Sequence, residues 1–164
     1  MRSFSAVELG VAFAIGGSFL AVAVPAFFRN LSASKLSEPI DGLDRMVVHA
    51  VAYAETHPQE ISFPPSAPLT PAQVPRGLRV VDPPDAWKHL TWLSLDFGFT
   101  EPHAFSFKFD SALEPATQVM RFTATAHGDL DGDGLLSTFE VRGEHLPGKP
   151  ARVLPGMFID REVE

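Results

Sequence analysis

The chain has 164 residues, of which 45% are hydrophobic and 20% are charged, so it has enough apolar side chains for one globular domain with an appendage. Its formal net charge is −7 and it has no run of lysine and arginine, which argues against binding to nucleic acid. It has no cysteine, which excludes thiolate nucleophiles, cysteine-based zinc sites and disulfide bonds.

The first predicted element is an uncharged apolar segment from Leu9 to Phe28, which is long enough to cross a bilayer as a helix. Arg2 precedes it, and positive charges tend to stay in the cytoplasm, so the residues after Arg29 are expected on the outer side of the membrane. Glu8 stands at the start of this segment, where burial of a carboxylate in lipid is costly unless a partner compensates its charge. A cleaved secretory signal, a signal anchor and a filament-assembly helix all remain open on composition alone.

The order of Phe4, Glu8, Gly17 and Pro25 resembles the amino-terminal signature of type IV pilins and pseudopilins. In that family a prepilin peptidase cuts before the phenylalanine and methylates the new amine; Ser3 stands here at the position that usually holds glycine. After such a cut, the Glu8 carboxylate of an adjacent copy would be the natural counterion of the new ammonium group. Pro25 lacks a backbone N–H, so the helix can bend there.

The resemblance implies three parts of the chain: a short leader over residues 1–3, an apolar helix over 4–30, and a head over 31–164 outside the cytoplasm. The apolar helix would lie in a bacterial inner membrane before assembly and in the core of a filament at the cell surface afterwards. The implied fold is α+β, with one long amino-terminal helix whose second half packs on a small antiparallel sheet. The implied partners are other copies of the chain or other pilins, the prepilin peptidase and the inner-membrane assembly machinery.

A second, amphipathic helix is predicted after Arg29, and Pro58 is expected to end it. Pro39 fits either the first turn of a new helix or a bend in a continuous one. Apolar residues recur in this stretch every three or four positions, at Leu36, Ile40, Leu43, Val47, Val51 and Ala54.

The rest of the head is predicted to be a loop followed by strands. Eight prolines between Pro58 and Pro84 predict a long connecting loop without helix or strand. Apolar and polar residues alternate over 105–109 and 120–126, as in half-buried strands, and 135–141 is expected to supply a third strand. Four large apolar residues before these strands are expected in the core or at a subunit contact, namely Trp87, Trp92, Leu93 and Leu95.

Residues 129–140 have the spacing of an EF-hand-type calcium loop. Carboxylates stand at positions one, three and five, glycine at six, a hydroxyl at nine and glutamate at twelve. The flanking patterns are strand-like rather than helical, so a calcium-binding hairpin is expected. The three aspartates are stronger candidates for ligands than the glutamate. The candidate ligands for Ca²⁺ are Asp129, Asp131, Asp133, the carbonyl of Leu135, Ser137 and Glu140.

No pattern of catalytic residues is present: the six histidines lack the spacing of metal ligands, and there is no nucleophile elbow, P-loop or dinucleotide fingerprint. The sequence therefore favours a structural subunit of a type IV pilus-like filament over an enzyme. Two alternatives remain, a pseudopilin of a type II secretion system and an anchored or secreted calcium-binding module that does not polymerise.

Overall fold

The computed structural model of the chain describes residues 10, 21 and 36–161. It divides the chain into two compact units, Met1–Leu36 and Ser37–Glu164. The predicted leader and apolar helix lie outside the described residues, apart from Gly10 and Ala21, which are helical. The same holds for the predicted processing and assembly residues Ser3, Phe4, Glu8, Gly17 and Pro25. Within the described part of the chain, no helix combines the length and the apolar character needed to span a bilayer.

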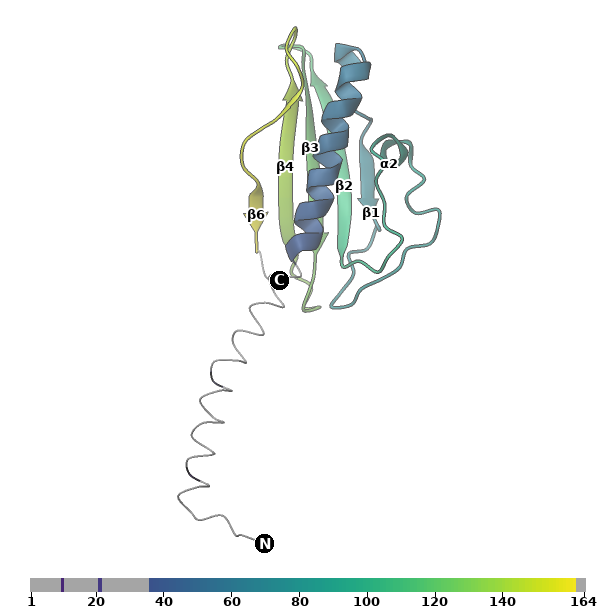
Figure 1. Ribbon diagram of the computed structural model, residues 1–164, viewed down its shortest axis with the longest axis vertical. Helices are drawn as coiled ribbons and strands as arrows, with labels where there is room; N and C mark the ends of the chain where they lie inside the picture. The colour runs from purple at the N-terminus through teal and green to yellow at the C-terminus, as the bar shows by residue number, and fades with distance from the viewer. Residues whose placement is uncertain (1–9, 11–20, 22–35, 162–164) are drawn as a thin grey trace. The chain divides into compact units, whose positions relative to one another are not determined.

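The head consists of one long helix, residues 36–56, that covers one face of a six-stranded antiparallel sheet (Figure 1). The strand order is β1-β2-β3-β4-β5, and β6 also pairs with β4. This arrangement confirms the expected α+β class with one helix on one antiparallel sheet. The strands are β1 (Ala67–Thr70), β2 (Phe105–Glu114), β3 (Val119–Gly128), β4 (Ser137–His145), β5 (Arg152–Val153) and β6 (Phe158–Asp160).

The helix ends at residue 56, just before Pro58, as predicted, and Pro39 lies near its described start. Its buried face differs from the predicted stripe by about one position. Ile40 is 38% exposed, whereas two residues outside the predicted stripe, Met46 and Ala50, are fully buried. Three residues of the predicted stripe, Leu43, Val47 and Ala54, are buried as expected, so the prediction of the apolar face is partly confirmed.

The core lies between this helix and the inward face of the sheet. Phe105, Phe107 and Phe109 alternate along β2, and all three are fully buried, as the sequence predicts. The neighbouring positions on β3 are small: Ala126 pairs with Phe107 and Ala124 pairs with Phe109. These alanines leave room for the phenylalanine rings, because protein cores are packed without spare volume.

The connection between the helix and β2 is more ordered than predicted. It contains a 3-10 helix η1 (Gln59–Ile61), the strand β1 and a short helix α2 (Leu90–Ser94). The expectation of a loop without helix or strand between Pro58 and Pro84 is therefore wrong. Pro68 lies within β1, which proline tolerates because this strand is at the edge of the sheet and pairs only with β2.

Glu38 holds the beginning of the helix against the beginning of β2. Its Oε1 accepts hydrogen bonds from the backbone N–H groups of Ala104 at 2.7 Å and Phe105 at 3.0 Å. Its Oε2 accepts one from the Arg79 guanidinium at 2.7 Å. The Glu38 side chain is only 11% exposed, so its bonds to the two backbone N–H groups are largely shielded from water, whereas the Arg79 side chain is 59% exposed. One carboxylate thus joins the helix, the proline-rich connection and the central part of the sheet.

Candidate metal centre

The predicted calcium loop connects the neighbouring strands β3 and β4. The last residue of β3, Gly128, pairs with the first residue of β4, Ser137, so the intervening residues 129–136 form the tip of a hairpin. The Ser137 hydroxyl donates a hydrogen bond to the carbonyl of Gly128 at 3.2 Å and is fully buried. The hairpin confirms the prediction of strand-like flanks, although β4 begins at residue 137 and not at 135.

Asp129 organises the loop from the inside. Its side chain is buried, and its two oxygens accept hydrogen bonds from backbone N–H groups: Oδ1 from Gly132 at 2.8 Å and Oδ2 from Gly134 at 3.1 Å. Both glycines have positive φ angles, 83° and 94°, which side chains other than glycine rarely adopt. The loop therefore curls around the Asp129 carboxylate.

Asp131 and Asp133 lie on the exposed side of the same curl. Asp131 Oδ1 accepts from the N–H of Asp133 at 3.1 Å, and Asp133 Oδ1 accepts from the N–H of Leu135 at 2.7 Å. One carboxylate oxygen from each of the three aspartates lies within 4.8 Å of the other two. The loop thus brings together the three carboxylates at positions one, three and five, whose mutual repulsion a cation would relieve.

A segment of the proline-rich connection contacts this loop. The N–H of Gly77 donates to the carbonyl of Asp129 at 2.7 Å, and Arg76 forms an isolated parallel bridge with Asp129. The Arg76 Nε lies 3.8 Å from Asp129 Oδ2, although its side chain is 74% exposed. At that exposure and distance the ion pair contributes little to stability. Even so, it gives Asp129 one cationic neighbour within the chain.

The remaining predicted ligands have other contacts. Glu140 lies within β4, opposite Thr125, and its Oε1 accepts a hydrogen bond from Arg142 Nε at 2.5 Å. Among the described residues, the group of carboxylates close enough to share an ion contains the three aspartates and not Glu140. The Ser137 hydroxyl donates a hydrogen bond to the carbonyl of Gly128, and the N–H of Leu135 donates one to Asp133 Oδ1.

His127 precedes the loop on β3, and its Nδ1 lies 2.9 Å from the hydroxyl of Thr138 on β4. Burial lowers the pKa of this histidine, and the positive charge of Lys108 lowers it further. A hydrogen bond to the backbone of Ser137 and the carboxylate of Glu140 act in the opposite direction. His127 therefore lies within β3, and its hydrogen-bond partner is Thr138 on β4.

The donor set consists of hard carboxylate oxygens, which suit Ca²⁺ or Mg²⁺ and not the transition metals that prefer nitrogen or sulfur ligands. Three monodentate carboxylates leave at least half of the six to eight coordination positions of Ca²⁺ for backbone carbonyls and water. Comparison of the chain with protein-family models, with curated proteins and with solved structures finds no match.

Sequence reasoning did not find Arg76, Gly77 or Glu38. Arg76 and Gly77 lie more than 50 residues before the aspartates, and Glu38 lies 66 residues before Ala104. Contacts over such separations leave no local pattern. The one local signal in the sequence was the glycine at position 77, because glycine is common at tight turns; in the structure Gly77 has a positive φ of 63°.

Proposed function

We propose that this chain is a structural subunit of a type IV pilus-like filament, with an amino-terminal segment that anchors and assembles it and a head stabilised by Ca²⁺. The observation that carries the proposal is the order of the segments along the chain. In the sequence, the segment with the Phe4, Glu8 and Pro25 pattern precedes the helix of residues 36–56, on which the α+β head is built. In this proposal the work of the protein is assembly and not catalysis.

The Glu8 carboxylate has a defined role in this proposal, namely to pair with the amine of Phe4 on an adjacent copy. Glu8→Ala is expected to abolish filaments while the head remains folded. Glu101→Ala, which changes an exposed carboxylate of the head, is the matched control and should leave filaments intact. The measurements are electron microscopy of sheared cell-surface material and circular dichroism of the purified full chain. Normal filaments from the Glu8→Ala variant would refute the proposal.

Mass spectrometry of the mature protein separates the proposal from its alternatives. A chain that begins with methylated Phe4 supports a pilin or pseudopilin. Cleavage near Ala23 supports a secreted module, and retention of Met1 supports a plain membrane anchor. Filaments at the cell surface, as opposed to a short periplasmic assembly, distinguish a pilin from a pseudopilin.

The second part of the proposal is that Asp129, Asp131 and Asp133 hold Ca²⁺. What supports it is the convergence of three carboxylates on one point of a loop whose backbone is fixed by Asp129. If free Ca²⁺ is present at a hundredfold excess over its dissociation constant, binding adds about 2.7 kcal/mol to the free energy of unfolding. A metal thereby supplies stability to a head that has no disulfide bond.

The test is thermal unfolding of the full chain in detergent, with Ca²⁺ and with excess chelator. Asp133→Asn retains an oxygen to accept the Leu135 N–H but removes one negative charge, so it should weaken the Ca²⁺-dependent shift with little effect in chelator. Asp160→Asn, at an exposed carboxylate in β6, is the control and should leave the shift unchanged. An identical melting temperature with Ca²⁺ and with chelator in the unmodified chain would refute Ca²⁺ binding.

A further inference from the structure

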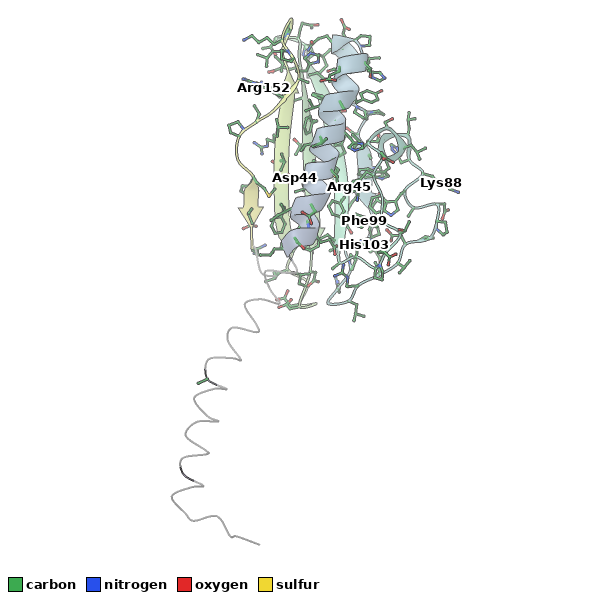
Figure 2. The ribbon with its side chains drawn as sticks, viewed as in Figure 1. Asp44, Arg45, Lys88, Phe99, His103 and Arg152 are labelled. Carbon is green, nitrogen blue, oxygen red and sulfur yellow. The ribbon has the colours of Figure 1, made fainter. Side chains whose placement is uncertain are left out.

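A pocket of about 630 Å³ opens between the long helix and residues 81–100, on the side of the head that carries α2. Figure 2 shows Arg45 of the helix and Phe99 beside each other on this side. Both tryptophans of the chain, Trp87 and Trp92, line the pocket together with Phe97 and Phe99. Its volume lies within the range of pockets that receive a small ligand. Four aromatic side chains in the wall favour a flat ring as the occupant, because aromatic rings attract one another through their edges and faces.

Ring contacts and hydrogen bonds fix the wall of this pocket. The ring of Trp87 meets those of Trp92 and Phe97 edge to face, with 5.5 Å between the ring centroids in both pairs. Trp87 Nε1 donates to Asp82 Oδ2 at 2.9 Å, and the same oxygen lies 2.9 Å from His103 Nε2. The Asp82 side chain is only 5% exposed, so its charge is engaged inside the wall and does not face a ligand. The pocket is therefore preformed, which lowers the cost of binding.

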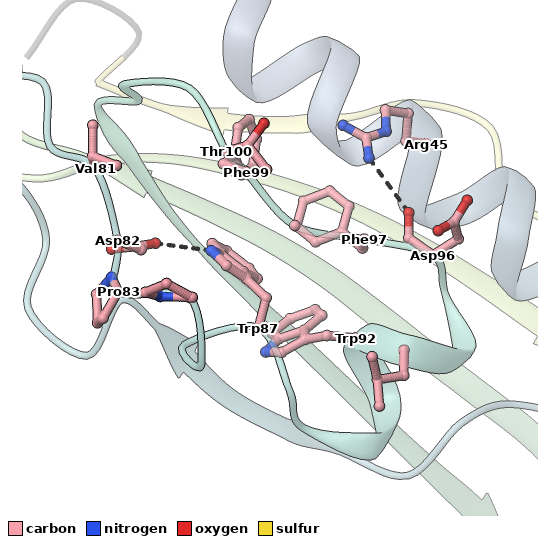
Figure 3. Close-up of a pocket in the computed structure, with 13 residues that line it drawn as sticks. Arg45, Val81, Asp82, Pro83, Trp87, Trp92, Asp96, Phe97, Phe99 and Thr100 are labelled. Atoms are coloured by element: carbon pink, nitrogen blue, oxygen red, sulfur yellow. Dashed lines mark hydrogen bonds between the residues drawn. The ribbon is translucent and has the colours of Figure 1, made fainter.

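Arg45 brings a positive charge to the rim of the pocket (Figure 3). Its Cζ lies 5.3 Å from the centroid of the Phe97 ring, a cation–π contact, and its Nη2 donates to the carbonyl of Asp96 at 3.4 Å. Each of the six other arginines among the described residues lies 3.8 Å or less from a carboxylate. Arg45 is the one arginine in that part of the chain without such a partner. Its guanidinium is thus held over an aromatic ring while its charge is left without a counterion.

The carboxylates nearest to Arg45 do not take this place. Asp41 and Asp44 precede it on the same helix and are exposed, and neither forms an ion pair with it. Asp96 is also exposed, and Figure 3 shows its carboxylate on the side away from Trp87. Arg45 is the one cationic residue in the lining of the pocket, so the site matches a single negative charge better than a doubly charged phosphate. The planar fork of a guanidinium fits the two oxygens of a carboxylate.

We propose that this pocket binds a small aromatic carboxylate, with the ring of the ligand against Trp87 and Phe99 and its carboxylate paired with Arg45. The apolar wall excludes water from the ring, and the ion pair at the rim fixes its orientation. All lining residues lie between Arg45 and Thr100, so the site includes neither the calcium loop nor the amino-terminal segment. The site therefore does not depend on the proposed filament function, and either proposal can fail without the other.

The test is nuclear magnetic resonance of the full chain in detergent, labelled with nitrogen-15. The chain has two tryptophans, so the spectrum contains two indole N–H signals, and both report on the pocket. The probe is 2-naphthoate, and the matched compound is 2-naphthamide, which has the same ring system without the charge. The naphthoate should shift at least one indole signal in a saturable way, with an affinity at least tenfold higher than that of the amide. Equal affinities for the two compounds would overturn the proposal.

A substitution gives the second arm. Arg45→Gln should lower the affinity for 2-naphthoate at least tenfold and change that for 2-naphthamide less than twofold, because the ring contacts remain. Arg121→Gln is the matched control, since it removes an exposed arginine of β3 outside the pocket, and it should leave both affinities unchanged. Absence of a saturable shift at millimolar 2-naphthoate, or unchanged binding in Arg45→Gln, would overturn the site. If Arg45→Gln does not fold, the comparison of the two compounds on the unmodified chain decides.

Discussion

Replacement of Glu38 tests how the helix is held to the sheet. Glu38→Ala removes the acceptor of two backbone N–H groups, those of Ala104 and Phe105, and of one Arg79 bond. A hydrogen bond to a charged group contributes about 1.5–3 kcal/mol, and a buried N–H left without a partner costs about 1–3 kcal/mol. Arg79 is 59% exposed, so its pair adds less than about 1 kcal/mol. The expected loss in the free energy of unfolding is about 3–5 kcal/mol.

Glu38→Gln is the matched variant for this experiment. Its amide oxygen replaces Oε1 and accepts both backbone N–H groups, so the loss falls to about 1–2 kcal/mol, which reflects the missing charge and the lost Arg79 bond. The assay is urea unfolding of the full chain in detergent, followed by tryptophan fluorescence, since both tryptophans lie in the head. Equal losses in the two variants, or a loss below about 1 kcal/mol for alanine, would show that Glu38 does not satisfy these N–H groups.

Two further substitutions test the packing and the loop. Gly143→Ala places a methyl group on the ring of Phe122, which is 2% exposed, so overpacking should lower the free energy of unfolding by about 1–3 kcal/mol in urea titration; an unchanged midpoint would show that the ring can move aside. Asp129→Asn leaves only one acceptor for the N–H groups of Gly132 and Gly134, so it should lower stability by about 1–3 kcal/mol even in chelator; equal melting temperatures of variant and parent in chelator would refute a structural role for this carboxylate.

Local patterns predicted the long elements of the head well. The alternation of Phe105, Phe107 and Phe109 marks a strand with one buried face, and the structure confirms it. Pro58 ends the helix region because proline cannot continue the hydrogen bonding of a helix. The spacing of the aspartates likewise predicted a hairpin loop whose three carboxylates converge, because the ligand pattern is contained within five consecutive residues.

The elements that sequence reasoning missed depend on distant parts of the chain. The strand β1 has four residues in a proline-rich region, and it exists because β2 offers an edge to pair with. The short strands β5 and β6 have two and three residues, too few for a visible alternation. The contact of Arg76 with Asp129 requires the connection to fold back onto the hairpin, and no local propensity encodes that step. Ile40 was placed in the core by its apolar character, but it lies at the margin of the buried face and is 38% exposed.

The carboxylate of Glu38 has a mechanical consequence. A pull on the chain from its amino-terminal side enters the head through the start of the helix, where this side chain is bonded to β2. The helix runs alongside the strands (Figure 1), so the pull shears the whole helix–sheet interface at once instead of peeling it apart turn by turn. Shear loads many contacts in parallel, so the helix–sheet interface of the head resists a force directed along the helix.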